Sequence, residues 1–176
     1  MKTKIVLMII IVILALSETT KKAIAVNSNY IIEDDVKYYI QTDKSIYDLG
    51  ENVEMLYEIT NIGSEAITFN FSYTPEWNFW VKNSNENLVF QAVTGWWTMG
   101  TSFTLQPNDN RDFSYIWDMK NSEGNLVELG AYTVIGGLDA NMGEYGYTQV
   151  PVGIDIIPEP SAVVLLSLGA LAICKN

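Results

Sequence analysis

The chain has 176 residues, enough for one ordinary domain with a further segment at each end. It contains no histidine, and its one cysteine, Cys174, lies near the C-terminus, so Ser-His-Asp triads, Cys-His dyads and imidazole metal sites are excluded. Between residues 26 and 157, five basic residues accompany 19 acidic ones. The resulting net charge of −14 would repel phosphate backbones and anionic lipid, so we expect no nucleic-acid partner.

Carboxylates are the remaining candidates for catalysis, but none of them lies in an apolar run that would raise its pKa. We therefore expect no enzymatic activity, no catalytic residue and no cofactor. The stretch DANMGE at 139–144 shares the spaced Asp and Asn of a calcium loop but lacks the glutamate at the twelfth position. We interpret it as a solvated hairpin tip and predict no metal site.

The first 25 residues have the organisation of a secretory signal peptide. Two lysines precede an apolar run over residues 5–16 that is too short to span a membrane as a helix. Cleavage after Ser17 and cleavage after Ala25 both fit the small residues that follow the run. We predict a signal peptide over residues 1–25 and an exported protein.

Short alternating strands and turns occupy residues 26–157. In the stretch 51–60, alternate positions are apolar (Val53, Met55, Tyr57 and Ile59), which is typical of a half-buried strand. Turn signals recur about every eight to twelve residues, and no longer stretch shows a helical period. The predicted strands lie at 38–45, 51–60, 65–73, 77–83, 88–93, 101–107, 111–118, 130–138 and 148–156.

This pattern predicts an all-β fold, an antiparallel immunoglobulin-like β-sandwich of eight or nine strands over residues 26–157. A closed barrel fits the same pattern. The predicted domain contains no cysteine, so its aromatic and aliphatic core must hold it together without a disulfide. In the predicted strand 77–83, one face carries Trp77, Phe79 and Val81. The opposite face carries Asn78, Trp80 and Lys82.

All five tryptophans lie between residues 77 and 117. Trp80 and Trp117 fall in or beside alternating strands, where we expect them to pack. Trp96 and Trp97 are adjacent, so in an extended chain one is expected to be buried and the other exposed. Two interpretations remain open: the indoles plug one end of the sandwich, or they form a patch that binds a protein or a sugar. On the second interpretation the candidate binding residues are Trp77, Trp96, Trp97 and Met99.

A series of motifs follows the predicted strands in order. They lie at Tyr47–Val53 (Tyr-x-x-Gly-Glu-x-Val), Asn61–Gly63, Phe69–Phe71, Phe79–Val81, Val89–Phe90, Phe103–Pro107, Phe113–Asp118 and Gly130–Gly136. The series resembles the BsuPI family of intracellular proteinase inhibitors over residues 47–138. Two positions depart from that family's pattern: Asn108-Asp109 stand where a Gly-Glu pair is usual, and Asn78 stands where an acidic residue is usual.

The resemblance implies a non-enzymatic β-sandwich whose partner is a serine protease, for example a subtilisin-like one. An inhibitor that imitates a substrate would present an extended loop to the protease cleft, and the candidate loops are 74–78 and 96–100. The alternative keeps the fold and changes the function to a structural or adhesion module associated with extracellular matrix or polysaccharide.

The last segment, 158–176, begins with Pro158-Glu159-Pro160 and continues with an apolar run before Lys175. As a helix the run would extend for about 21 Å, which is short of the roughly 30 Å hydrocarbon core of a membrane. Together, the Pro-Glu-Pro motif, the apolar run that follows it and the basic residue near the end resemble a PEP-CTERM sorting signal. The resemblance implies recognition by an exosortase-type processing enzyme, transient association of the tail with the membrane, and delivery to the cell surface or exterior together with exopolysaccharide.

Overall fold

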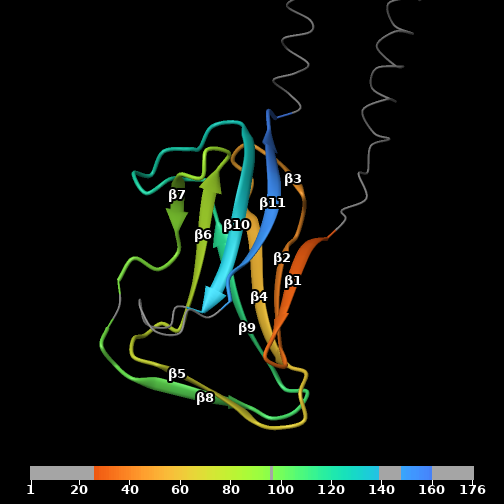
Figure 1. Cartoon of the computed structure of the whole chain (residues 1–176). Coiled ribbons are helices and arrows are strands. Elements are labelled where there is room, and N and C mark those ends of the chain that lie inside the picture. The colour runs from red at the N-terminus through yellow and green to blue at the C-terminus, as the bar shows by residue number, and fades with distance from the viewer. Residues whose placement is uncertain (1–25, 96, 139–147, 160–176) are drawn as a thin grey trace, which may run out of the picture.

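The computed structural model describes residues 26–95, 97–138 and 148–159 (Figure 1). Within these ranges the chain forms β-strands and no helix, and therefore no helix there is long and apolar enough to cross a membrane. The strands are β1 (Asn27–Glu33), β2 (Val36–Thr42), β3 (Ile46–Asp48), β4 (Val53–Asn61), β5 (Ile67–Phe71), β6 (Trp77–Asn83), β7 (Leu88–Gln91), β8 (Thr101–Leu105), β9 (Asn110–Trp117), β10 (Gly130–Leu138) and β11 (Val150–Ile157).

The strands form two sheets and a separate two-stranded ribbon (Figure 1). One sheet has the order β1-β2-β4-β9 and the other has the order β3-β11-β10-β6-β7. The ribbon of β5 and β8 lies across the lower end of the sandwich in Figure 1. Every pairing between strands is antiparallel except that of β3 with β11. The predicted antiparallel immunoglobulin-like β-sandwich is confirmed, and the closed barrel does not form among the described strands.

The alternation in β4 places its apolar side chains in the core, as predicted. Val53, Tyr57 and Ile59 are fully buried and Met55 is 2% exposed. Burial of each such side chain contributes about 1.5–3 kcal/mol, so the core can hold the domain without a disulfide. The same core cluster includes, from the five-stranded sheet, Phe79, Val81, Val134, Val152, Ile154 and Ile156.

The described residues form eleven strands, whereas the sequence predicts eight or nine. The sequence does not predict β1, because Asn27–Glu33 shows no strict alternation and most of its side chains are exposed. Asp34 and Asp35 have φ angles of 48° and 61°, which suit a two-residue hairpin turn between β1 and β2. The side-chain amides of Asn27 and Asn29 donate to backbone carbonyls of β11. A local turn and these amide contacts, not a hydrophobic period, hold β1 in place.

The predicted terminal segments fall largely outside the described residues. The signal peptide predicted over 1–25 lies outside them entirely. In the sorting segment, Pro158 and Glu159 follow β11 and are described, whereas Pro160 and Lys175 are not. Both terminal assignments stay predictions from the sequence.

Candidate functional site

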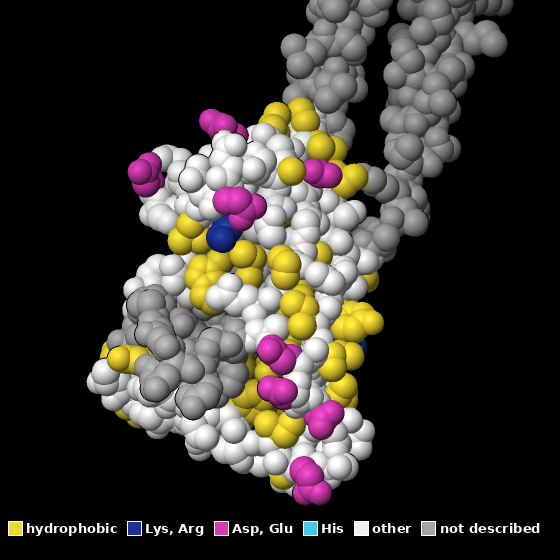
Figure 2. Space-filling model, viewed as in Figure 1, with side chains coloured by type: hydrophobic (Ala, Val, Ile, Leu, Met, Phe, Trp, Pro, Cys, Tyr) yellow, Lys and Arg dark blue, Asp and Glu magenta, His cyan; other side chains and the backbone are white. Residues whose placement is uncertain are grey.

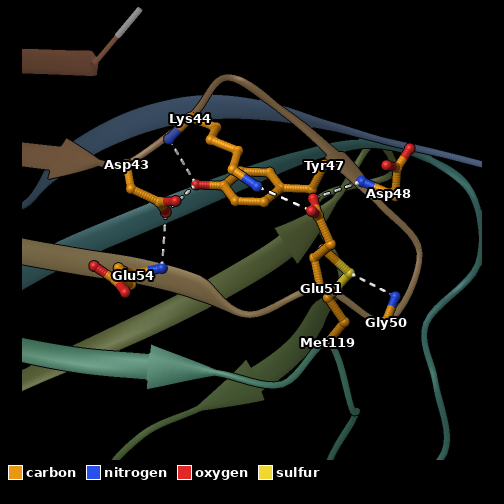
Figure 3. Close-up of polar contacts among 8 residues, drawn as sticks. All are labelled: Asp43, Lys44, Tyr47, Asp48, Gly50, Glu51, Glu54 and Met119. Atoms are coloured by element: carbon orange, nitrogen blue, oxygen red, sulfur yellow. Dashed lines mark hydrogen bonds and ion pairs between the residues drawn. The ribbon is translucent and has the colours of Figure 1, made fainter. Parts of the chain in front are cut away.

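The Tyr-x-x-Gly-Glu-x-Val motif forms a hydrogen-bonded corner between β2, β3 and β4, the Tyr47 corner (Figure 3). Tyr47 is fully buried, and its hydroxyl donates to Asp43 Oδ1 at 2.7 Å and accepts from the backbone N–H of Lys44 at 3.0 Å. Asp43 Oδ1 also accepts from the backbone N–H of Glu54 at 3.0 Å. The corner divides the predicted strand 38–45 into β2 and the beginning of the turn that leads to β3.

Glu51 completes the Tyr47 corner with both of its carboxylate oxygens (Figure 3). Its Oε1 lies 2.9 Å from Lys44 Nζ, and its Oε2 accepts from the backbone N–H of Asp48 at 2.9 Å. Gly50 has a φ of +89°, a conformation that residues with a Cβ rarely adopt, and its N–H donates to Met119 Sδ at 3.3 Å. The motif residues therefore build a turn, because Tyr and Glu supply its hydrogen bonds and Gly permits its backbone conformation.

Two pKa values are shifted at the Tyr47 corner. Burial raises the pKa of the Tyr47 hydroxyl above its usual range, and the hydrogen bond to Asp43 adds to the shift. The hydrogen bond from Lys44 to Glu51 raises the pKa of the Lys44 ammonium. Both shifts favour the protonated form at neutral pH, so these two side chains act as fixed structural donors.

Two later motifs of the series also have structural roles. Gly136 in β10 lies against the ring of Tyr57, and a Cβ at this position would be 2.8 Å from Tyr57 Cδ2. Trp117 is fully buried, its indole N–H donates to the carbonyl of Lys120 at 2.8 Å, and its ring centroid lies 6.1 Å from that of Tyr132. These two motif residues therefore contribute to the packing of the sandwich.

The Asn108-Asp109 pair, at the position where the BsuPI pattern uses Gly-Glu, lies in the turn between β8 and β9. Asn108 has a φ of 69°, in the left-handed region that asparagine adopts more readily than most residues. Its N–H donates to the carbonyl of Asn61 at 2.9 Å, and Asp109 Oδ2 accepts from the N–H of Gln106 at 3.0 Å. Asn108 therefore suits the backbone conformation of this turn, and the Asp109 side chain closes it.

The residues between β7 and β8 are here called the β7–β8 connection, and hydrogen bonds to Asn78 and to Thr74 are its two main anchors among the described residues. The first anchor is Asn78 in β6, whose side chain is fully buried. Its Oδ1 accepts from the N–H of Val93 at 2.9 Å, and its Nδ2 donates to the carbonyl of Val93 at 3.2 Å. An acidic residue at position 78 would lack the donor for the second bond. The sequence places Asn78 opposite Phe79 but gives no direct sign of its burial; the departure from the family pattern is the one signal at this position.

The second anchor of the β7–β8 connection is Thr74, which forms an isolated antiparallel bridge with Trp97. The Thr74 N–H donates to the Trp97 carbonyl at 3.0 Å, and the Trp97 N–H donates to the Thr74 carbonyl at 3.1 Å. The Met99 N–H donates to the same Trp97 carbonyl at 2.8 Å, and Thr74 Oγ1 donates to the Met99 carbonyl at 3.2 Å. Residues 97–99 therefore form a three-residue turn centred on Thr98, here called the Trp97 turn.

The Trp97 turn presents two large apolar side chains to solvent. Trp97 is 68% exposed and Met99 is 66% exposed, the two largest fractions among the exposed large hydrophobic residues of the described chain. Trp97 therefore does not plug the end of the sandwich. Trp77 packs on the core, with its ring centroid 5.7 Å from that of Phe79 and 6.1 Å from that of Phe113. Trp96 lies outside the described residues.

Of the four candidate binding residues, the structure thus brings Trp97 and Met99 together on one exposed turn and places Trp77 against the core. Sequence reasoning singled out the two exposed residues but missed the anchors. The sequence pattern does not distinguish Thr74 and Asn78 from exposed polar residues, because their hydrogen-bond partners lie far along the chain. The binding role of the candidates stays a prediction.

Acidic side chains outnumber basic ones on the molecular face drawn in Figure 2. Figure 2 shows Asp and Glu side chains scattered over one face of the molecule, with little Lys or Arg among them. The stretch 92–100 carries no charged residue. Among the described residues, no group of three or more Cys, Asp or Glu side chains could hold a metal ion, and the stretch 139–144 lies outside those residues.

The chain belongs to the BsuPI family, described as intracellular proteinase inhibitors. The family model matches residues 40–142, which is more than half of the chain. The matched range contains the Tyr47 corner, both anchors of the β7–β8 connection and the Trp97 turn. Family membership indicates a module of the proteinase-inhibitor type. A search of curated proteins finds no match.

Solved structures that are similar to this chain share little sequence with it. A β-glucosidase from Erythrobacter marinus is 12% identical with a TM-score of 0.41, and the match covers 75% of this chain but only 16% of the enzyme. A CARDB domain from Pyrococcus furiosus is 15% identical with a TM-score of 0.40, over 71% of this chain and 96% of that domain. An alkylpurine DNA glycosylase from Pseudomonas fluorescens is 8% identical with a TM-score of 0.43, over 72% of this chain and 31% of the glycosylase. Likenesses at this level carry no argument about function.

Proposed function

We propose that the chain is a non-enzymatic inhibitor of a subtilisin-like serine protease and that it binds the protease through the Trp97 turn. The observation that carries this proposal is the exposure of Trp97 and Met99 on a turn whose backbone is tied to Thr74. Membership of the BsuPI family supports the choice of a protease as the partner.

The two anchors favour binding because they order the turn before the partner arrives. Association is weakened when loops and side chains must become ordered at the interface. Asn78 and Thr74 hold the β7–β8 connection at Val93 and at Trp97, so less of this ordering remains to be done on binding. An exposed indole on a fixed backbone is a frequent energetic centre of protein interfaces.

The charge distribution also supports a protein partner. An uncharged turn can enter an apolar pocket without the desolvation of a buried ion. The acidic remainder of the domain favours a partner with a basic rim around that pocket, and such complementarity mainly raises the association rate at low salt. The same acidity disfavours nucleic acid.

We further propose that the protein is exported and acts at the cell surface or outside the cell. The signal peptide expected over 1–25 and the PEP-CTERM-like segment at 158–176 support this location. An exosortase-type enzyme would process the second segment, and exopolysaccharide would accompany the product. Intact-mass measurement of the mature protein tests the proposal: loss of the first 17 or 25 residues and of Cys174 is expected, and retention of both segments would contradict it.

A fluorogenic assay with subtilisin tests the inhibitor function directly. The purified chain is expected to inhibit the protease at micromolar concentration. Absence of inhibition would overturn the proposal. If the chain instead bound a neutral polysaccharide in a glycan pull-down, the alternative of a matrix-associated module would replace it.

Matched variants locate the binding surface. Trp97→Ala is expected to raise the inhibition constant at least about tenfold, equivalent to about 1.4 kcal/mol. Tyr30→Ala serves as the control, because Tyr30 is an aromatic residue with a comparable exposure of 57% on β1, in the sheet that does not carry the β7–β8 connection. An equal loss of inhibition in both variants would show that the Trp97 turn is not the binding surface.

A further inference from the structure

We infer that the Trp97 turn binds its protease through side chains alone and that the protease does not cleave the turn. This inference rests on the proposed function and specifies how the site works. It differs from the extended loop that a substrate-like inhibitor would present, and it follows from the hydrogen bonds within the turn.

A substrate-like segment binds by adding a strand to the enzyme. The main-chain N–H and C=O groups of alternate residues pair with the enzyme, while the side chains of those residues enter its pockets. A residue whose side chain fills the primary pocket must therefore have its own backbone groups available. The peptide must also be extended on both sides of that residue.

The backbone groups of Trp97 and Met99 are already engaged inside the protein. The N–H of Trp97 donates to the Thr74 carbonyl, and the Trp97 carbonyl accepts from the N–H groups of Thr74 and Met99. The Met99 carbonyl accepts from Thr74 Oγ1. A protease that paired with these backbone groups would have to break several of these hydrogen bonds.

The conformation of the turn also argues against substrate-like binding. The bond between the Met99 N–H and the Trp97 carbonyl closes a three-residue turn, so the chain bends at Thr98 instead of running extended. Residues on the two sides of the bend cannot lie in one line of pockets. What the turn offers to a partner is the indole and the thioether side chain.

The chemistry of these two side chains defines the pocket. The stretch 92–100 contains no Lys or Arg, so it suits an apolar recess and not the acidic primary pocket of a trypsin-like enzyme. The indole supplies a rigid anchor with a large contact area, and the flexible thioether of Met99 can adapt to the pocket edge. Trp97 and Met99 are therefore the specificity residues of the site.

A trypsin test separates this binding mode from a substrate-like one. The full chain with Met99→Arg is incubated with trypsin. We expect no inhibition of trypsin, and we expect the bond after position 99 to stay intact in the folded chain but to be cut after heat denaturation. Inhibition of trypsin by this variant, or cleavage after position 99 in the folded chain, would overturn the inference.

A second test uses subtilisin and the unmodified chain. Intact-mass measurement after prolonged incubation should show no cut between positions 97 and 100 while inhibition persists. Trp97→Ala and Met99→Ala should each weaken inhibition about tenfold, whereas Tyr30→Ala, on β1 of the other sheet, should leave it unchanged within about twofold. Inhibition accompanied by cleavage within the turn would overturn the inference and leave the proposed function standing. No inhibition by the unmodified chain would overturn both.

Discussion

The Tyr47 corner and the β7–β8 connection are both held by hydrogen bonds, but they leave different groups at the surface. At the corner, the aromatic residue itself makes the bonds, and Tyr47 is fully buried. In the connection, the Asn78 side chain bonds to Val93, and the Thr74 backbone bonds to Trp97, whose side chain is 68% exposed. The first motif of the series therefore stabilises the fold, whereas two of the candidate binding residues, Trp97 and Met99, lie on a turn that other residues support.

The largest effect is expected at the corner. Tyr47→Ala should lower the free energy of unfolding by about 3–5 kcal/mol, because it leaves a cavity and removes the partner of Asp43 and of the Lys44 N–H. Denaturation in urea measures the change. Tyr39→Ala is the control, since Tyr39 is only half-buried in the neighbouring strand β2. A loss below about 1 kcal/mol for Tyr47→Ala would contradict a structural role of the corner.

A smaller loss is expected at the first anchor of the β7–β8 connection. Asn78→Ala should destabilise the domain by about 1–3 kcal/mol, because the N–H and carbonyl of Val93 lose their partner. Hydrogen exchange at the Val93 amide should become faster. The exposed Asn85 provides the control substitution, Asn85→Ala. Unchanged exchange at Val93 in the Asn78 variant would show that the connection is held in another way.

Alkaline pH should weaken the corner by up to about 1.4 kcal/mol per pH unit. The pKa of Tyr47 is higher in the folded chain than its ordinary value of 10.0, which applies to the unfolded chain. Stability from this group is therefore complete below pH 10.0 and falls as the pH rises above it, because the unfolded chain releases the proton first. The unfolding free energy measured on both sides of that pH should decline less steeply in Tyr47→Phe than in the unmodified chain. Equal slopes would contradict the burial of this hydroxyl.

The smallest stability effect is expected at the Trp97 turn. Trp97→Ala should change the free energy of unfolding by no more than about 0.5 kcal/mol, because an exposed side chain contributes little to the core. Trp117→Ala is the matched comparison, since its indole is fully buried and should be among the costliest tryptophans to remove. A large destabilisation by Trp97→Ala would indicate a structural role for this indole.

The sequence predicts those parts of the fold that depend on periodicity. The alternation of Val53, Met55, Tyr57 and Ile59 identifies both the strand and its buried face, and all four side chains are in the core. Similar patterns elsewhere lead to the sandwich. Periodicity does not predict the edge strand β1, because this strand has no buried face. A two-residue turn and amide contacts to β11 hold it in place.

The candidate site is predictable only in part for the same reason. Trp97 and Met99 attract attention as apolar residues in a glycine-flanked stretch, and that feature is local. Their anchors depend on contacts across the fold, such as Thr74 with Trp97 and Asn78 with Val93, which leave no periodic pattern. The packing of Trp77 on Phe79 and Phe113 likewise depends on how the sheets meet.

The most direct test compares one variant from each region in the same inhibition assay, under conditions where both are folded. Trp97→Ala should keep the stability of the unmodified chain and weaken inhibition of subtilisin at least about tenfold. Tyr47→Phe should lose about 1–3 kcal/mol of stability and inhibit as well as the unmodified chain. The account would be contradicted if Tyr47→Phe, fully folded, lost inhibition while Trp97→Ala retained it.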